Sequence, residues 1–152
     1  MSRIEVPLLD KIIRATGDIV LRAEVDLLVR TNTQNWEPVA FRVDSGTEMT
    51  SMAVRRAQML DVPFPRRAVH GVRFGQAGHE VRSGVLRVQV VGMDSTEYII
   101  PCYFLGDPAA SPATMPISLL GLTGVVDKLR LTFDGKPGRA GAPHGILVVE
   151  RQ

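Results

Sequence analysis

Aromatic side chains and cysteines are scarce in this chain of 152 residues. Phe, Trp and Tyr together make up 5% of the sequence, so a core must be built mainly from Val, Leu, Ile, Ala and Met. The single cysteine, Cys102, excludes an intrachain disulfide, and a reducing compartment is its simplest home. Its spacing from the three histidines matches no ligand or thiol-enzyme pattern, so we expect no metal and no cofactor.

Long apolar runs and long runs of one charge are also missing. No stretch approaches the roughly 20 apolar residues of a membrane helix, and the first residues lack the apolar run of a signal peptide. The formal charge is +2, and the basic pairs at 55–56 and 66–67 are more typical of a solvated face than of a nucleic-acid surface. We therefore expect a cytoplasmic protein that binds neither membrane nor nucleic acid.

The pattern that is present has a period of two. Apolar residues occupy the odd positions of segment 19–29, with Arg22, Glu24 and Asp26 between them. This alternation predicts a strand with one face on a core and one in water. Further strands are predicted over 37–43, 86–90, 98–105, 129–133 and 146–149. Segment 37–43 follows a polar turn and should pair antiparallel with the first strand, and Pro101 indicates an edge or a bulge. The chain is long enough for one mostly β domain, residues 1–152.

Helix is expected in two places only. Apolar residues recur at helical spacing at Met49, Ala53, Ala57 and Leu60. They predict a helix that begins near residue 50, with Thr50 or Ser51 as its cap, and ends before Pro63. A second short helix is predicted over 124–128. The segments 106–116 and 135–145 are rich in Pro or Gly and should be loops, and the second lacks the residue order of a phosphate-binding loop.

The chemistry is expected where the strand 37–43 runs into Asp44-Ser45-Gly46-Thr47. Gly46 would permit an unusual φ at that turn, and the two hydroxyls would hold it. The same residues are also typical of an ordinary solvent turn. A second element, Leu119-Leu120-Gly121, ends an apolar segment on glycine and is followed by the strand 129–133. A serine hydrolase at Ser45 is disfavoured because G-x-S-x-G is absent.

Together these segments resemble the retropepsin-like aspartic protease family. In that family a strand ends in Asp-[Thr/Ser]-Gly-[Ala/Ser/Thr], a glycine-tipped hairpin forms a flap, and a late hydrophobic-hydrophobic-Gly element leads into a helix. The resemblance spans about residues 19–134 and implies a closed, mostly β barrel with a flap hairpin and one or two short helices. It also implies a homodimer with the active site on the two-fold axis. Residues 135–152 would be a loop and a terminal strand at the subunit interface.

The resemblance assigns a role to each motif residue. Asp44 would be catalytic, Ser45 would reach the partner backbone across the dimer axis, and Gly46 would bring its N–H to the carboxylate. The Thr47 hydroxyl would stabilise the ionised carboxylate, which predicts a more acidic optimum than in relatives with alanine there. The flap would span 69–90. Its substrate-binding residues would be Phe74, Gly75, Gln76, Ala77 and Gly78.

The chain departs from the family after Gly121, where Leu122-Thr123 replaces the frequent Arg-Asp or Arg-Asn. The charged lock between subunits is therefore not expected. Peptide hydrolysis by carboxylates needs two of them around one water, and the motif occurs once. The sequence thus predicts an aspartic endopeptidase that acts on peptides or proteins as a homodimer, with one Asp44 from each copy. The alternative is a catalytically inactive module of the same fold that dimerises or binds extended peptides.

Overall fold

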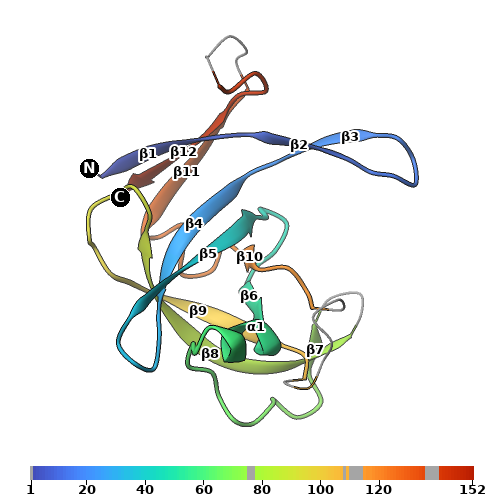
Figure 1. Ribbon diagram of the computed structural model, residues 1–152, viewed down its shortest axis with the longest axis vertical. Coiled ribbons are helices and arrows are strands. Elements are labelled where there is room, and N and C mark those ends of the chain that lie inside the picture. The colour runs from blue at the N-terminus through green and yellow to red at the C-terminus, as the bar shows by residue number, and fades with distance from the viewer. Residues whose placement is uncertain (1, 75–77, 108, 110–114, 136–140) are drawn as a thin grey trace.

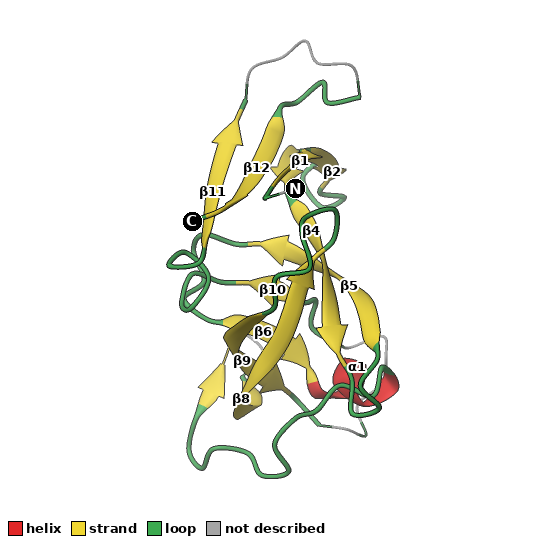
Figure 2. Ribbon diagram, turned by 90° about the vertical axis from the view of Figure 1, so that its left-hand side faces the viewer, coloured by secondary structure: helices red, strands yellow, loops and turns green. Residues whose placement is uncertain are grey.

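Strands dominate the computed structural model, which describes residues 2–74, 78–107, 109, 115–135 and 141–152 (Figures 1 and 2). The mostly β class predicted from the alternating pattern is confirmed. Within these residues the strands are β1 (Arg3–Pro7), β2 (Leu9–Ile12), β3 (Ile19–Arg22), β4 (Glu24–Arg30), β5 (Trp36–Val43), β6 (Thr50–Ala53), β7 (Arg73–Phe74), β8 (His79–Val90), β9 (Tyr98–Leu105), β10 (Leu119–Leu120), β11 (Leu129–Asp134) and β12 (Ile146–Arg151). The helix is α1 (Val54–Met59).

The largest sheet has the strand order β4-β5-β10-β6-β9-β8-β7. Strands β4 and β5 pair antiparallel, as the sequence predicts. Strand β8 also pairs with β4, over Leu27 to Val29, so the sheet curves back towards its first strand. Strand β9 lies between β8 and β6, but its pairing with β6 starts only at Cys102. At Pro101 it therefore has β8 as its paired neighbour, and the missing N–H of proline is tolerated there.

Two smaller sheets involve the ends of the chain. Strands β1, β12 and β11 form a three-stranded sheet with β12 in the middle. Both edges of β12 are thus paired within its own chain, so main-chain pairing with a second copy along this strand is not open to it. Strands β2 and β3 pair with each other in a separate two-stranded sheet.

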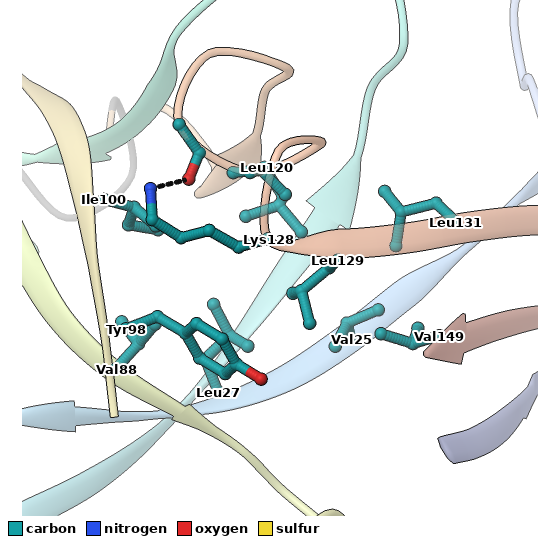
Figure 3. Close-up of a pocket in the computed structure, with 12 residues that line it drawn as sticks. Val25, Leu27, Val88, Tyr98, Ile100, Leu120, Lys128, Leu129, Leu131 and Val149 are labelled. Carbon is teal, nitrogen blue, oxygen red and sulfur yellow. Dashed lines mark hydrogen bonds between the residues drawn. The ribbon is translucent and has the colours of Figure 1, made fainter. Parts of the chain in front are cut away.

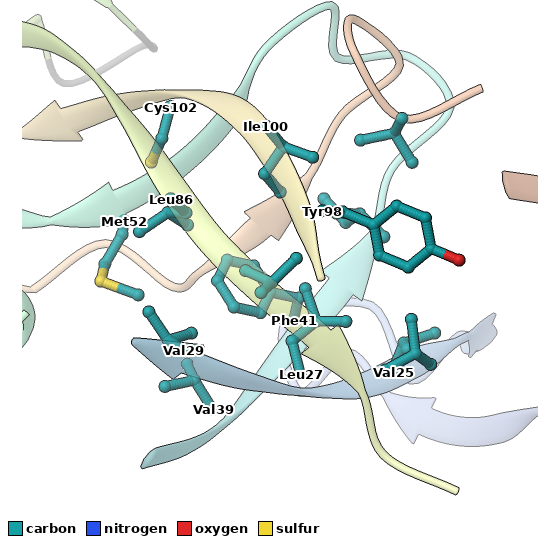
Figure 4. Close-up of a cluster of buried hydrophobic side chains, with 14 of the residues drawn as sticks. Val25, Leu27, Val29, Val39, Phe41, Met52, Leu86, Tyr98, Ile100 and Cys102 are labelled. Atoms are coloured by element: carbon teal, nitrogen blue, oxygen red, sulfur yellow. The ribbon is translucent and has the colours of Figure 1, made fainter. Parts of the chain in front are cut away.

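The core lies inside the curve of the largest sheet (Figure 4). Its members alternate along the strands, so that Val25, Leu27 and Val29 on β4 are buried while Asp26 between them is exposed. Figure 4 shows Phe41 among these side chains, with Cys102 and Met52 at one end of the cluster. The core also takes in residues from outside 19–134, namely Leu8, Leu147 and Val149.

Both predicted helices require correction. Residues 50–53 form strand β6, and α1 covers only Val54–Met59. Thr50 and Ser51 are fully buried in that strand, so neither caps a helix. The prediction was wrong because β6 has paired strands on both sides, and a strand buried throughout can match helical spacing by chance. Residues 124–128 form turns, and Gly124 has a φ of +70°, which no α-helix contains. Within the described residues, none of the helical structure has the length and apolar character needed to cross a bilayer.

The predicted strand 19–29 is interrupted as well. It is divided at Ala23 into β3 and β4. The prediction of one core-facing side holds for β4, whereas in β3 the apolar residues Ile19 and Leu21 are exposed. The alternation itself continues through both strands, but β3 pairs with β2 outside the main sheet.

Candidate active site

Asp44 lies at the first position after β5, in the turn that leads to β6. It is half-buried, while Ser45 and Gly46 are exposed. The Asp44 N–H donates to the Leu120 carbonyl over 3.1 Å, and its own carbonyl accepts from the Thr47 N–H over 3.2 Å. The backbone on both sides of the carboxylate is therefore fixed by main-chain hydrogen bonds.

Both carboxylate oxygens of Asp44 are hydrogen-bonded from within the motif. The Gly46 N–H donates to Oδ1 over 2.9 Å, and the Thr47 hydroxyl donates to Oδ2 over 2.9 Å. Gly46 does not adopt a positive φ, so the expectation of an unusual backbone conformation there is wrong. A Cβ at this position would lie 3.3 Å from Oδ1, and glycine therefore serves the close approach of its N–H to the carboxylate.

The late Leu119-Leu120-Gly121 element holds this turn in place. As β10 it lies between β5 and β6, parallel to the first and antiparallel to the second. The chain then turns, and the Leu122 N–H donates to the carbonyls of Thr47 and Glu48 over 3.1 Å each. Leu120 pairs with Val43 in the register. The Asp44 turn is therefore held by hydrogen bonds to a segment about 75 residues later in the sequence.

Gly121 and Thr50 form a buried lock behind the turn. The Gly121 N–H donates to the Thr50 hydroxyl over 3.1 Å, and both residues are buried. A Cβ on Gly121 would lie 2.4 Å from the Met49 carbonyl carbon, so only glycine fits at this crossing. Sequence reasoning placed Thr50 at a helix cap and missed this role. The sequence alone contains no signal for it, because the two residues are 71 positions apart.

Ser45 faces an apolar hollow beside the turn. The hollow measures about 290 Å³. Its lining includes Ser45, Leu122, Val126, Arg130 and Phe133. Leu122, Val126 and Phe133 are exposed in the single chain, and among the described residues no hydrogen-bond partner of the Ser45 hydroxyl is found. This side of the turn therefore presents an uncovered apolar surface next to the motif.

A hairpin occupies the place predicted for the flap. Strands β7 and β8 pair antiparallel, with Phe74 opposite His79, and Gly78 has a φ of +63°. Gly75, Gln76 and Ala77, the other predicted tip residues, lie outside the described residues. Phe74 packs edge-on against Tyr103, with ring centroids 5.5 Å apart. Tyr103 stands opposite Ser51 of β6 in the register. The contact between Phe74 and Tyr103 joins distant segments and was not predicted.

Two further cavities lie near these elements. A polar hollow of about 250 Å³ lies on the outer side of β5, with Glu24, Arg42 and Arg56 in its lining. A small apolar cavity of about 10 Å³ lies under the turns 121–128 (Figure 3). There the Lys128 ammonium donates to the Gly124 carbonyl over 2.7 Å. The apolar cavity is too small for a ligand, and the described residues contain no group of His, Cys, Asp and Glu that could hold a metal.

Comparison with known proteins gives a match in structure and none in sequence. No protein-family model and no curated sequence matches the chain. Among solved structures, it is similar to a retropepsin-like aspartic protease from Rickettsia conorii, with a TM-score of 0.56 and 15% identity. The match covers 98% of this chain and 90% of that one. The chain has the retropepsin-like fold.

This fold likeness does not extend to residue roles, because 15% identity shows the fold alone. The likeness concerns the arrangement of the strands around the Asp44 turn. The strand-end carboxylate, the inserted β10 and the β7–β8 hairpin all belong to one structure that is similar over nearly its whole length. Fold by itself does not establish chemistry.

Proposed function

We propose that this chain is one subunit of a homodimeric aspartic endopeptidase. The observation that carries the proposal is the position of the Asp44 carboxylate, which is held by the Gly46 N–H and the Thr47 hydroxyl at the end of β5. Both hydrogen bonds measure 2.9 Å, and β10 pairs with β5 beside the turn. The likeness in fold to a retropepsin-like aspartic protease supports the same activity.

A second copy supplies the second carboxylate in this proposal. The chain carries Asp-Ser-Gly once, and hydrolysis by carboxylates alone needs two of them close enough to share a proton. A two-fold axis beside the turn brings Asp44 of each copy to one water. The uncovered apolar hollow next to Ser45 supports an interface on this side of the chain.

The reaction then follows from the pair of carboxylates. The ionised Asp44 takes a proton from the water as its oxygen attacks the scissile carbonyl carbon, and the protonated Asp44 of the other copy donates to the carbonyl oxygen. The tetrahedral intermediate collapses as the C–N bond breaks. The amine nitrogen takes a proton from the carboxyl group that accepted the water proton, and a hydroxyl of the intermediate returns its proton to the other carboxylate, so that the pair again shares one proton. The hydrogen bonds from Gly46 and Thr47 orient the Asp44 carboxylate during these steps.

Substrate binding is assigned to the β7–β8 hairpin in this proposal. The hairpin serves as the flap of a closed barrel, and an extended peptide lies between it and the Asp44 turn. Phe74, supported by its edge-on contact with Tyr103, forms an apolar wall for a substrate side chain. An apolar wall of this kind favours cleavage next to an apolar residue.

Cleavage of a peptide library between acidic and neutral pH tests the proposal. Wild-type protein should cut the peptides, and Asp44→Asn should lower kcat by about 1000-fold or more, because an amide is neither base nor acid. The matched control is Asp127→Asn, since the Asp127 side chain is 65% exposed and outside the motif. Cleavage that survives Asp44→Asn contradicts the proposal. Peptide binding without cleavage in the wild type would favour the inactive module instead.

A further inference from the structure

The hairpin formed by β2 and β3 carries an apolar face that nothing in the described chain covers. Opposed residues of an antiparallel pair share a face, and the register places Ile12 opposite Ile19 and Asp10 opposite Leu21. Ile12, Ile19 and Leu21 therefore lie together, and they are 62%, 65% and 52% exposed. We name these three residues the Ile12 face. The opposite face carries Leu9, Lys11, Val20 and Arg22, and its two apolar residues are 38% exposed each.

The Ile12 face continues the core-facing pattern of the main sheet. Ile19 and Leu21 have the same odd-numbered phase as Val25 and Leu27, which are buried on β4. The alternation thus predicts a buried apolar face along both strands, but the residues on this face are buried only from Ala23 onwards. A hairpin of two strands is at best marginally stable in water without packing partners. The pattern therefore indicates that the cover for β3 comes from another molecule.

The base of the hairpin is anchored to the rest of the chain. Leu8 is buried, and its N–H donates to the Gly145 carbonyl over 2.9 Å. His144 lies 3.7 Å from the Asp10 carboxylate. At the other strand, Arg22 forms an ion pair with Glu24 at 3.4 Å. The hairpin is thus held in a fixed direction, as Figure 1 shows where β2 and β3 extend to one side of the fold.

That direction is the side on which Asp44 lies. The Val43 N–H donates to the Ala23 carbonyl over 2.9 Å, so the end of β5 and the end of β3 are direct neighbours. Strand β5 runs antiparallel to β4 and points towards the hairpin (Figure 1). A second copy that brings its Asp44 to this one must approach the same end of the β4–β5 pair. It therefore approaches the hairpin.

From these observations we infer that the β2–β3 hairpin is a dimerisation arm whose Ile12 face packs on the second copy of this chain. The inference rests on the proposed homodimer and identifies the segment that stabilises it. The charges of segment 9–22 favour a protein partner over a membrane surface, because Asp10 and Asp18 nearly balance Lys11, Arg14 and Arg22. By two-fold symmetry each copy gives one arm and receives one.

Sedimentation velocity over a range of protein concentrations tests the arm. Ile12→Lys and Ile19→Lys should each raise the dimer dissociation constant about tenfold or more, because each charge would be buried in an apolar contact. Val20→Lys is the matched control on the opposite face of the same hairpin and should change the constant less than about threefold. Asp44→Asn should leave the dimer intact.

A second experiment remains valid even if a lysine variant folds poorly. Ile12→Cys carries the only accessible thiol, since Cys102 is buried, and takes a benzophenone maleimide. Irradiation should give a covalent dimer in high yield. The same label on Gln58→Cys, an exposed position on α1, should not. Equal yields from both positions would overturn the inference.

The outcomes separate the arm from the proposed chemistry. A wild-type dimer that cleaves peptides and is unaffected by Ile12→Lys overturns the arm alone. A dimer that Ile12→Lys dissociates, but that cleaves no peptide, supports the arm and removes the proposed activity. A monomer at all concentrations overturns both. Co-sedimentation with phosphatidylcholine–phosphatidylglycerol vesicles that Ile12→Lys abolishes, with no effect on dimerisation, would assign the face to a membrane.

Discussion

The Asp44 turn and the β2–β3 hairpin leave the same end of the β4–β5 pair, but they are stabilised in different ways. Behind the turn, Thr50 and Gly121 are buried and hydrogen-bonded to each other, and β10 connects the turn to both flanking strands. Among the described strands, β2 and β3 pair only with each other, and the most apolar face of this hairpin is exposed. The two segments are neighbours, because the Val43 N–H donates to the Ala23 carbonyl.

The difference teaches where each segment finds its partners. The turn needs a fixed carboxylate, and every contact that fixes it comes from the same chain. The hairpin has the alternation of a packed strand without the packing. A single chain thus contains a hydrogen-bonded Asp44 turn next to an apolar face that the described residues leave exposed. Substitutions in the turn should lower the free energy of unfolding of a single chain, whereas those in the hairpin should raise the dissociation constant of the proposed dimer.

The largest effect is expected at Gly121. In Gly121→Ala the new Cβ would lie 2.4 Å from the Met49 carbonyl carbon and 2.7 Å from the Thr50 nitrogen, so backbone must move. We expect the free energy of unfolding to fall by about 3 kcal/mol or more, as measured by urea denaturation. Gly135→Ala is the control, because no atom lies within 4 Å of its Cβ position. Equal stability of the two variants would show that the backbone around Gly121 can accommodate a Cβ without cost.

Loss of the Thr50 hydroxyl should have the next largest effect. Thr50→Val keeps the shape but leaves the buried Gly121 N–H without its acceptor, which costs about 1–3 kcal/mol. Thr50→Ser keeps the acceptor and loses one methyl group, worth about 1 kcal/mol. Denaturation of all three proteins measures the difference. If the valine variant is at least as stable as the serine variant, the hydrogen bond does not support the turn.

Strands β4, β5, β8 and β11 could be predicted because apolar residues alternate along them, and β9 and β12 because each is a short, mostly apolar run. The prediction fails for β6, because a strand buried on both sides has no alternation and its residues at 49, 53, 57 and 60 happened to match a helix. The prediction of a helix over 124–128 is wrong because the segment is short, and the positive φ of Gly124 does not change the spacing of the apolar residues in the sequence.

The candidate site could be predicted only in part. The motif places Gly46 and Thr47 within two and three residues of Asp44, so their hydrogen bonds are local and follow from the sequence. The contact of Gly121 with Thr50 joins residues 71 positions apart, and a single sequence contains no signal for such a pair. In β3 the alternation correctly indicated an apolar face, but it does not reveal which molecule covers that face.

Alkaline pH should lower the free energy of unfolding because the Cys102 thiol is buried. This thiol lies opposite Thr50 in the register, and burial raises its pKa far above the ordinary value. The unfolded chain releases the proton above pH of about 8.5 while the folded chain keeps it, so stability is present below that pH and falls by about 1.4 kcal/mol per unit above it. Denaturation between pH 7 and 10 should show a steeper fall for wild type than for Cys102→Val. Parallel curves would contradict this.

The smallest effect on a single chain is expected in the hairpin. Ile12→Ser removes a side chain that is 62% exposed and has no core neighbour, so at protein concentrations low enough to keep the chain monomeric the free energy of unfolding should change by less than about 0.5 kcal/mol. At concentrations that favour the dimer, the same variant should be clearly less stable than wild type, because partner binding adds to the stability of the folded state. Chemical denaturation at both concentrations measures the two effects. A large loss in the dilute monomer would show that the hairpin packs on its own chain, and the contrast with the Asp44 turn would then disappear.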